Sequence, residues 1–197
     1  MNSKSSRTKQ YIIEKTAPVF NAKGYSGTSI NDLMVATGLT KGSIYGNFEN
    51  KNEVALAAFD YNFQQIVLFI RANMDTKVSC IDKLLVYPET YRNYLKLPFL
   101  SQGCPIANTS TEADDTHPQL KKKAAEALNF WRDALENLLK IGIERGEIKS
   151  DININEVVGV ISALIQGAVI HVKASGKVHF LNATMTFLEK MIKDLKV

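Results

Sequence analysis

Apolar residues recur every three or four positions along almost the whole chain, and this spacing predicts helices rather than strands. The first such run covers 6–23, where Ile12, Ala17 and Phe20 share one face. Gly24 follows this run, and a glycine in that place favours a helix stop. Further long or short helices are expected at 51–74, 78–97, 106–113, 119–145, 157–174 and 180–195. No segment alternates apolar and polar residues over the length of a strand, so we expect an all-α fold.

Two short helices lie between the first and second long runs, and a tight turn joins them. Thr28 is the expected N-cap of a helix over 30–36, and Thr40 is the expected N-cap of a helix over 41–48. Gly38 stands between them, where glycine supplies the positive φ that the turn requires. The apolar residues of both helices are spaced to pack on the first helix. This arrangement predicts a helix-turn-helix, which places its second helix in the major groove of DNA.

The charge of the chain is concentrated around this motif. The 197 residues carry 24 Lys+Arg and 20 Asp+Glu, a net charge of +4. The first 51 residues hold seven of these cations and three of these anions, so the whole surplus lies there. A basic helix-turn-helix indicates a polyanionic partner. We therefore expect a three-helix DNA-binding domain at 1–51 and a neutral helical bundle at 52–197.

Residues 20–53 read FNAKGYSGTSINDLMVATGLTKGSIYGNFENKNE. This stretch resembles the TetR family of bacterial transcriptional regulators in its KGY, its TS helix start, its GL turn, its TKGSIY helix and the lysine that opens the next helix. A second segment, GCPIANTSTEADDTHPQL at 103–120, is similar to one branch of that family. The resemblance implies a homodimeric regulator, most often a repressor, that binds a palindromic double-stranded DNA operator and is released by a small-molecule effector. It also implies that 52–197 is the domain that binds the effector and dimerises.

The expected DNA contacts lie along the second helix of the motif and at two other helix N-termini. Small and polar side chains there let the backbone approach base edges, and helix N-termini attract phosphates. Gly42 is a poor helix former, and close approach to DNA explains it better than tight helix packing does. Tyr45 faces either DNA or the core. The predicted contacts are Thr28, Thr40, Lys41, Gly42, Ser43, Tyr45, Asn47 and Lys51.

A stripe of small residues marks the expected dimer interface. Gly159, Ala163 and Gly167 recur at i, i+4 and i+8 on the 157–174 helix, where another helix can come close. Leu188 and Ile192 extend the interface onto the last helix. Two such helices from each protomer would form an intermolecular four-helix bundle. The alternative is that the stripe packs inside one protomer.

Aromatic residues gather in the middle helices, and they suit an effector cavity with apolar walls. Tyr91 and Trp131 are the predicted cavity residues, with ordinary core as the alternative. Cys104 is added to them because it precedes a short helix, where the helix N-terminus lowers the pKa of a thiol. Cys104 is thus also a candidate sensor of oxidants or electrophiles, and an inert small residue is the alternative.

Two other function classes compete with a DNA-binding regulator. One is a small helical enzyme with Cys104 as nucleophile and His117 as base, which lacks a third orienting residue. The other is an interaction module whose basic face binds an acidic protein. Asp114, Asp115 and His117 lack the spacing of a metal site and favour a turn.

Known sequence motifs narrow the choice further. The chain has no CxxC, HExxH, GxGxxG or GxxxxGK[ST] motif, so we predict no metal, no cofactor and no enzyme activity. We expect the apolar stretch 157–172 to be too short to span a bilayer. The first residues hold no apolar segment typical of a signal peptide. These features predict a cytoplasmic protein without a membrane partner.

Overall fold

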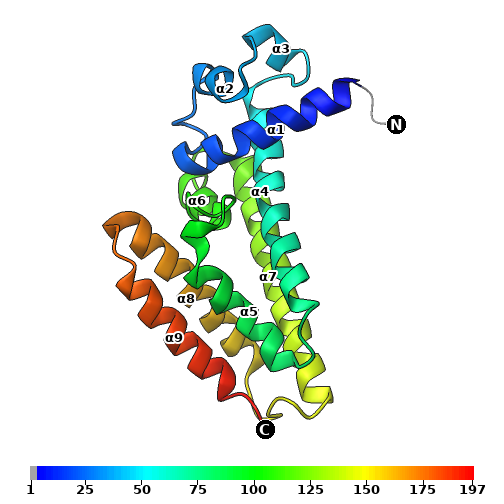
Figure 1. Ribbon diagram of the computed structural model, residues 1–197, viewed down its shortest axis with the longest axis vertical. Helices are drawn as coiled ribbons and strands as arrows, with labels where there is room; N and C mark the ends of the chain where they lie inside the picture. Colours follow the sequence, from blue (N-terminus) through cyan, green and yellow to red (C-terminus); the bar gives the residue numbers. More distant parts are fainter. Residues whose placement is uncertain (1–3) are drawn as a thin grey trace. The chain divides into compact units, whose positions relative to one another are not determined.

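The computed structural model describes residues 4–197, with side chains from residue 5 onward (Figure 1). The helices are α1 (Lys4–Lys23), α2 (Ile30–Thr37), α3 (Lys41–Tyr45), α4 (Lys51–Met74), α5 (Cys80–Arg92), the 3-10 helix η1 (Tyr94–Lys96), α6 (Pro105–Glu112), α7 (Pro118–Glu144), α8 (Ile154–Ser175) and α9 (His179–Lys193). Within 4–197 the only extended pairing is an isolated bridge between Ile148 and Lys196. The predicted all-α fold is confirmed.

Two predicted helices end earlier than expected. The helix predicted over 41–48 stops at Tyr45, where Gly46 donates to the Gly42 carbonyl oxygen and Asn47 donates to the Ile44 carbonyl oxygen at 3.0 Å. This last bond spans three residues and tightens the chain, so that Phe48 turns into the core. The helix predicted over 78–97 divides into α5 and η1 because the Asn93 amide closes a similar three-residue bond on Thr90.

The chain folds into two compact units. Unit 1 comprises Met1–Ile66 and Cys104–Ala125, and unit 2 comprises Val67–Gly103 and Glu126–Val197. α4 and α7 therefore each contribute to both units. These units follow spatial packing, whereas the division of function at residue 51 stays a prediction.

The core of unit 1 joins α1, α2 and α3 to the first half of α4. Its buried members come from all four helices and from the segment after α3, as the spacing of apolar residues predicted: Ile12, Ala17, Phe20, Leu33, Ile44, Phe48, Val54, Ala55 and Ala58. Each large side chain here contributes about 1.5–3 kcal/mol by leaving water. Asn62 of α4 also donates to the Ala17 carbonyl oxygen at 2.9 Å, which fixes α1 on α4 by a buried polar contact. The short α2 and α3 are thus held by a shared core.

The core of unit 2 is built around α9, which packs on both α5 and α8. α9 buries one stripe, Leu181, Met185, Leu188 and Ile192, inside its own protomer. The prediction that Leu188 and Ile192 face a second protomer was therefore wrong, since both side chains are 0 % exposed in a single chain. An ion pair of 2.7 Å between Arg92 and Glu189 also ties α5 to α9.

α8 is longer than the apolar stretch in the sequence indicated. It has 22 residues, and an 18-residue window in it reaches a mean hydropathy of 1.8 with 33 % of that window buried. The prediction that the apolar stretch 157–172 is too short to span a bilayer was wrong, because the helix continues beyond this stretch at both ends, through 154–156 and 173–175. Length and composition alone are weak evidence for a membrane span, since core helices of soluble proteins share them. Because only 33 % of this window is buried, α8 is an apolar helix with one exposed face.

Candidate nucleic-acid interface

The N-terminus of α2 is closed by Ser29. Its hydroxyl accepts from the Asp32 amide at 3.1 Å, and the Asp32 carboxylate accepts from the Ser29 amide at 2.8 Å, which forms a capping box. Lys23 donates to the same carboxylate at 2.6 Å. The hydrogen bonds from Lys23 and then from Ser29 hold the pKa of Asp32 well below its usual range. The N-terminus of α2 is therefore capped by Ser29 and Asp32, and Lys23 binds the same Asp32 carboxylate.

Thr28 does not cap α2, and that prediction was wrong. Its side chain is 1 % exposed, and its hydroxyl donates to the Gly24 carbonyl oxygen at 2.6 Å. The extended backbone that a cap requires falls one residue later, at Ser29. Thr28 consequently supports the turn after α1 from inside.

α3 presents an exposed N-terminal turn of small and polar residues. Thr40 caps the helix by accepting from the Ser43 amide at 3.2 Å, as predicted. Residues 40–43 are all exposed, whereas Ile44 is buried and anchors the helix. A Cβ atom on Gly42 would meet only the Thr40 hydroxyl, at 3.9 Å. Packing within the protein therefore does not require glycine at residue 42.

The remaining predicted contacts differ in how far they are engaged within the protein. Tyr45 is half-buried, with the Lys41 ammonium 6.0 Å from its ring centroid. Asn47 donates to the Ser43 carbonyl oxygen at 2.9 Å. Lys51 is half-buried and donates to two carbonyl oxygens of the turn after α1, those of Tyr25 and Thr28, each at 2.9 Å. Lys51 thus holds this turn in place whether or not it also meets a phosphate.

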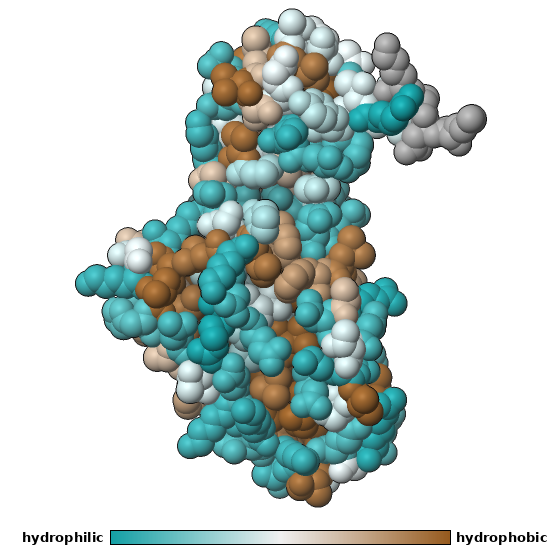
Figure 2. All heavy atoms as spheres, in the orientation of Figure 1, coloured by the Kyte–Doolittle hydropathy of each residue, from teal (hydrophilic) through white to brown (hydrophobic). Residues whose placement is uncertain are grey.

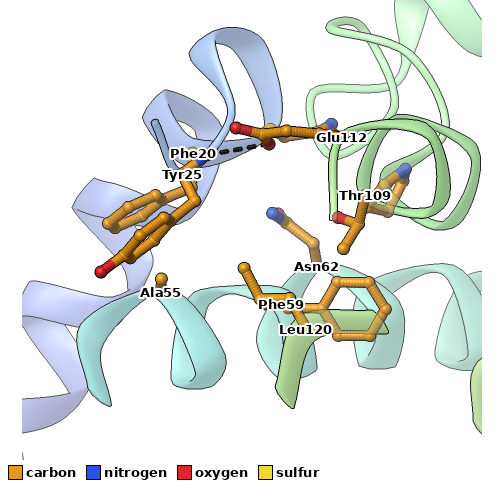
Figure 3. Close-up of a pocket in the computed structure, with 10 residues that line it drawn as sticks. Phe20, Tyr25, Ala55, Phe59, Asn62, Thr109, Glu112 and Leu120 are labelled. Carbon is orange, nitrogen blue, oxygen red and sulfur yellow. Dashed lines mark hydrogen bonds between the residues drawn. The ribbon is translucent and has the colours of Figure 1, made fainter. Parts of the chain in front are cut away.

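Sequence reasoning missed a cluster around Tyr25. Glu112 of α6 accepts from the Tyr25 and Ser26 amides, and His117 packs edge-on against the Tyr25 ring with centroids 4.4 Å apart. Beside them lies a cavity of about 20 Å³ that α1, α4, α6 and the start of α7 enclose (Figure 3). Glu112 lies 87 residues beyond Tyr25, so no local pattern signalled the contact.

Unit 2 contains a cavity of about 450 Å³ with mostly apolar walls. Its lining residues come from α4, α5 and α7 and are Val67, Ile70, Arg71, Met74, Tyr87, Phe130, Trp131, Ala134, Asn137, Leu138 and Ile141. Trp131 lines it as predicted. Tyr91 is fully buried and packs on Trp131 with centroids 5.6 Å apart, while Tyr87 takes the place in the wall predicted for Tyr91. Burial raises the pKa of Tyr87 well above its usual range.

Cys104 does not line this cavity and belongs to unit 1. Its side chain is 0 % exposed, which removes the access that a reactive thiol requires. His117, the proposed base, accepts from the Leu120 amide through Nδ1 at 3.2 Å and closes the start of α7. No group of three metal-ligating side chains occurs in the part of the chain that the structure describes.

The exposed flanks of α8 and α9 form a continuous apolar face. Gly159, Ala163 and Gly167 are exposed, and a Cβ atom on either glycine would meet nothing within 4 Å. His171 of α8 stacks on Phe180 of α9 at 4.1 Å, so the two flanks adjoin. Figure 2 shows hydrophobic atoms gathered where α8 passes into α9. We define the apolar face as Gly159, Val160, Ala163, Gly167, Ile170, Phe180 and Phe187.

Comparisons with known proteins cover both parts of the chain. Residues 12–58 match the family model described as bacterial regulatory proteins, tetR family, and residues 80–188 match the one described as tetracyclin repressor-like, C-terminal domain. The first match contains α2 and α3. The second covers more than half of the chain.

Solved structures and a curated protein agree with these matches. A TetR-family regulator from Cytophaga hutchinsonii is 43 % identical, with a TM-score of 0.94 over 100 % of this chain and 98 % of that one. A TetR regulator from Chloroflexus aurantiacus is 34 % identical, with a TM-score of 0.91 over 98 % of both chains. The HTH-type transcriptional repressor DhaR of a Mycobacterium species is 26 % identical over 84 % of this chain and 82 % of its own length.

Proposed function

The chain belongs to the TetR family of bacterial transcriptional regulators, and from this premise we propose that it binds a palindromic operator as a homodimer and is released by a small-molecule effector. The matched family and the relatives named above are transcriptional regulators, which indicates a DNA-binding regulator rather than an enzyme. Repressors are found among these relatives, which supports repression as its action. We also propose that it acts in the cytoplasm.

The exposed N-terminal turn of α3 carries this proposal. Thr40, Lys41, Gly42 and Ser43 have no role in the core, and Gly42 lowers helix stability without any packing need. In the major groove these residues would meet base edges, while Tyr45, Asn47 and Lys51 would meet phosphates or flanking bases. The buried Thr28 would act through the backbone of its turn.

The apolar face of α8 and α9 supports homodimerisation. Val160, Ile170, Phe180 and Phe187 are each 36–60 % exposed in a single chain. A second copy would cover them by the same face, since a two-fold interface uses one patch twice. The stripe Gly159, Ala163 and Gly167 would let the two α8 helices come close. Such a dimer presents two α3 helices to half-sites about 34–36 Å apart.

The cavity in unit 2 is the proposed effector site. Its volume of about 450 Å³ falls in the range of small-molecule pockets. Arg71 lines it, and within the described residues the Arg71 guanidinium makes no hydrogen bond or ion pair. An effector with an apolar body and one anionic group would match this wall. Trp131 provides the test: we expect decanoate to change its fluorescence at lower concentration than decanol does, and Arg71→Gln to remove that preference.

Selection of bound DNA from a random pool tests the main proposal. We expect the selected sequences to share a palindrome, and the affinity for it to fall with rising salt because phosphate contacts release counterions. A nonpalindromic site, or a wild-type protein that stays monomeric at micromolar concentration, would overturn the dimeric mode of binding. Salt-dependent binding to acidic proteins with no DNA preference would favour the interaction module instead.

A further inference from the structure

We propose that Glu112 is a positioning residue for DNA binding, which ties the turn between α1 and α2 to α6 and so holds the helix-turn-helix in the orientation that the operator requires. This role rests on the proposed function. It gives a role to the segment 103–120, which contains none of the predicted DNA contacts and none of the residues that line the cavity of unit 2.

The contact is a carboxylate held by two consecutive backbone amides. Tyr25 N donates to Glu112 Oε2 at 2.9 Å, and Ser26 N donates to Glu112 Oε1 at 2.9 Å. Both oxygens are thereby used, and charge-assisted bonds of this kind are about twice as strong as neutral ones. Figure 3 shows Glu112 reaching from α6 to the Tyr25 backbone. These two amides belong to the turn that leads into α2, so the carboxylate holds that turn against α6.

Gly24 is the residue that makes room for this carboxylate. Its φ is +72°, a conformation that glycine adopts without strain. A Cβ atom on Gly24 would also lie less than 2.6 Å from the three carboxylate atoms of Glu112. Any other residue at position 24 would therefore expel the carboxylate as well as strain the turn.

The surroundings restrain the same turn from other directions. The Lys51 ammonium lies 4.2 Å from the Tyr25 ring centroid, and His117 packs against the edge of that ring. One turn before Glu112 on α6, Asn108 donates to the Asn21 side-chain oxygen at 2.8 Å near the end of α1. α6 is thus bonded to α1 through Asn108 and to the turn through Glu112, one helical turn later. We call the hydrogen bonds of these two residues the α6 tether.

The first experiment measures operator affinity and amide exchange in Glu112 variants. With DNA selected by the wild-type protein, we expect Glu112→Ala to weaken binding about tenfold and Glu112→Gln about threefold, because an amide can accept from only one of the two N–H groups. Glu144→Ala, on an exposed glutamate at the end of α7, is the matched control and should leave affinity unchanged. In Glu112→Ala the Tyr25 and Ser26 amides should lose protection from hydrogen exchange, whereas the α4 core should keep it.

The possible results separate the tether from the proposed function. Unchanged affinity together with lost protection would overturn the positioning role and leave Glu112 a local structural contact. Unchanged protection would overturn the contact itself. A wild-type protein that selects no DNA refutes the proposed function and with it the positioning role, while amide exchange still decides whether the carboxylate holds the turn.

A double-mutant cycle provides the second experiment, which remains informative if a single variant folds poorly. We expect Gly24→Ala to weaken DNA binding in the wild-type background both by expelling Glu112 and by straining the turn, and to have a smaller effect in the Glu112→Ala background, where only the strain of the positive φ remains. Gly146→Ala controls for backbone strain, because Gly146 has φ +68° and open space around its Cβ position. Additive effects of Gly24→Ala and Glu112→Ala would refute the α6 tether.

Discussion

Phe187 on the apolar face gives the sharpest test of the proposed dimer. Phe187 is 60 % exposed in the single chain, so its replacement by alanine should lower the stability of the protomer only slightly. An aromatic side chain buries about 150–250 Å² when fully covered, and covering the exposed part of Phe187 would remove roughly 100 Å² from water. At about 25 cal/mol per Å² this amounts to about 2.5 kcal/mol per copy. A two-fold interface contains two copies, so Phe187→Ala should weaken dimerisation by about 5 kcal/mol, or several thousandfold in Kd.

Leu68 of α4 is the matched control because its residue is also 60 % exposed and it lies outside the apolar face. Sedimentation equilibrium of the wild-type protein, Phe187→Ala and Leu68→Ala gives the three dimerisation constants. Thermal unfolding at two protein concentrations then separates the stability of the protomer from that of the dimer. Equal dimerisation constants for the two variants would refute the assignment of this face, and so would a concentration-independent unfolding temperature of the wild-type protein.

Four further predictions follow from the site. Tyr45→Ala and Lys51→Ala should each weaken operator binding about tenfold at fixed salt without unfolding the protein, and unchanged anisotropy titrations in both would contradict the docking of α3. Ser29→Ala should lower the free energy of unfolding by about 1 kcal/mol in urea titrations, and no change would disprove its capping role. Asp32 has a folded pKa below its unfolded value, so the stability from its ionised form is complete above the unfolded pKa and is lost as the pH falls through the folded one; Asp32→Asn should flatten the acid limb of the stability profile, and an unaltered limb would argue against this. Cys104 should react with iodoacetamide only as fast as the protein opens, and Cys104→Ser should leave DNA binding in the presence of electrophiles unaltered; rapid labelling of the native protein would restore the sensor hypothesis.

Local chemistry was enough to predict the helices and the motif. Gly24, Gly38, Gly146 and Gly176 each take a positive φ beside a helix end, as a glycine after a periodic run indicates. The amphipathic spacing in 12–48 likewise led to the observed core of unit 1. Adjacent capping residues were harder to separate. Thr28 and Ser29 have similar hydroxyl groups, and the backbone conformation at Ser29 decides between them.

The direction in which an apolar stripe faces could not be predicted from its spacing. Leu188 and Ile192 have the periodicity of an interface helix, but the same periodicity serves packing inside one chain. α9 uses it for contact with α5 and α8, and leaves a different flank, with Phe180 and Phe187, exposed. Glu112 was missed for another reason. A carboxylate that binds backbone amides 86 and 87 residues away leaves no mark in either local sequence.

The open space around Gly42 has a consequence for how such a regulator can diversify. A Cβ atom added there meets no neighbour closer than 3.9 Å, and replacing glycine by alanine within a helix adds stability of about 0.5–1 kcal/mol. The fold therefore has room for a Cβ atom at this position, and under the proposed docking of α3 the operator is what would restrict it. If α3 docks as proposed, gene duplication followed by a change at residue 42 would alter the target sequence with no compensating change needed in the scaffold. The same freedom makes residue 42 the first position to randomise when the specificity of this protein is to be redesigned.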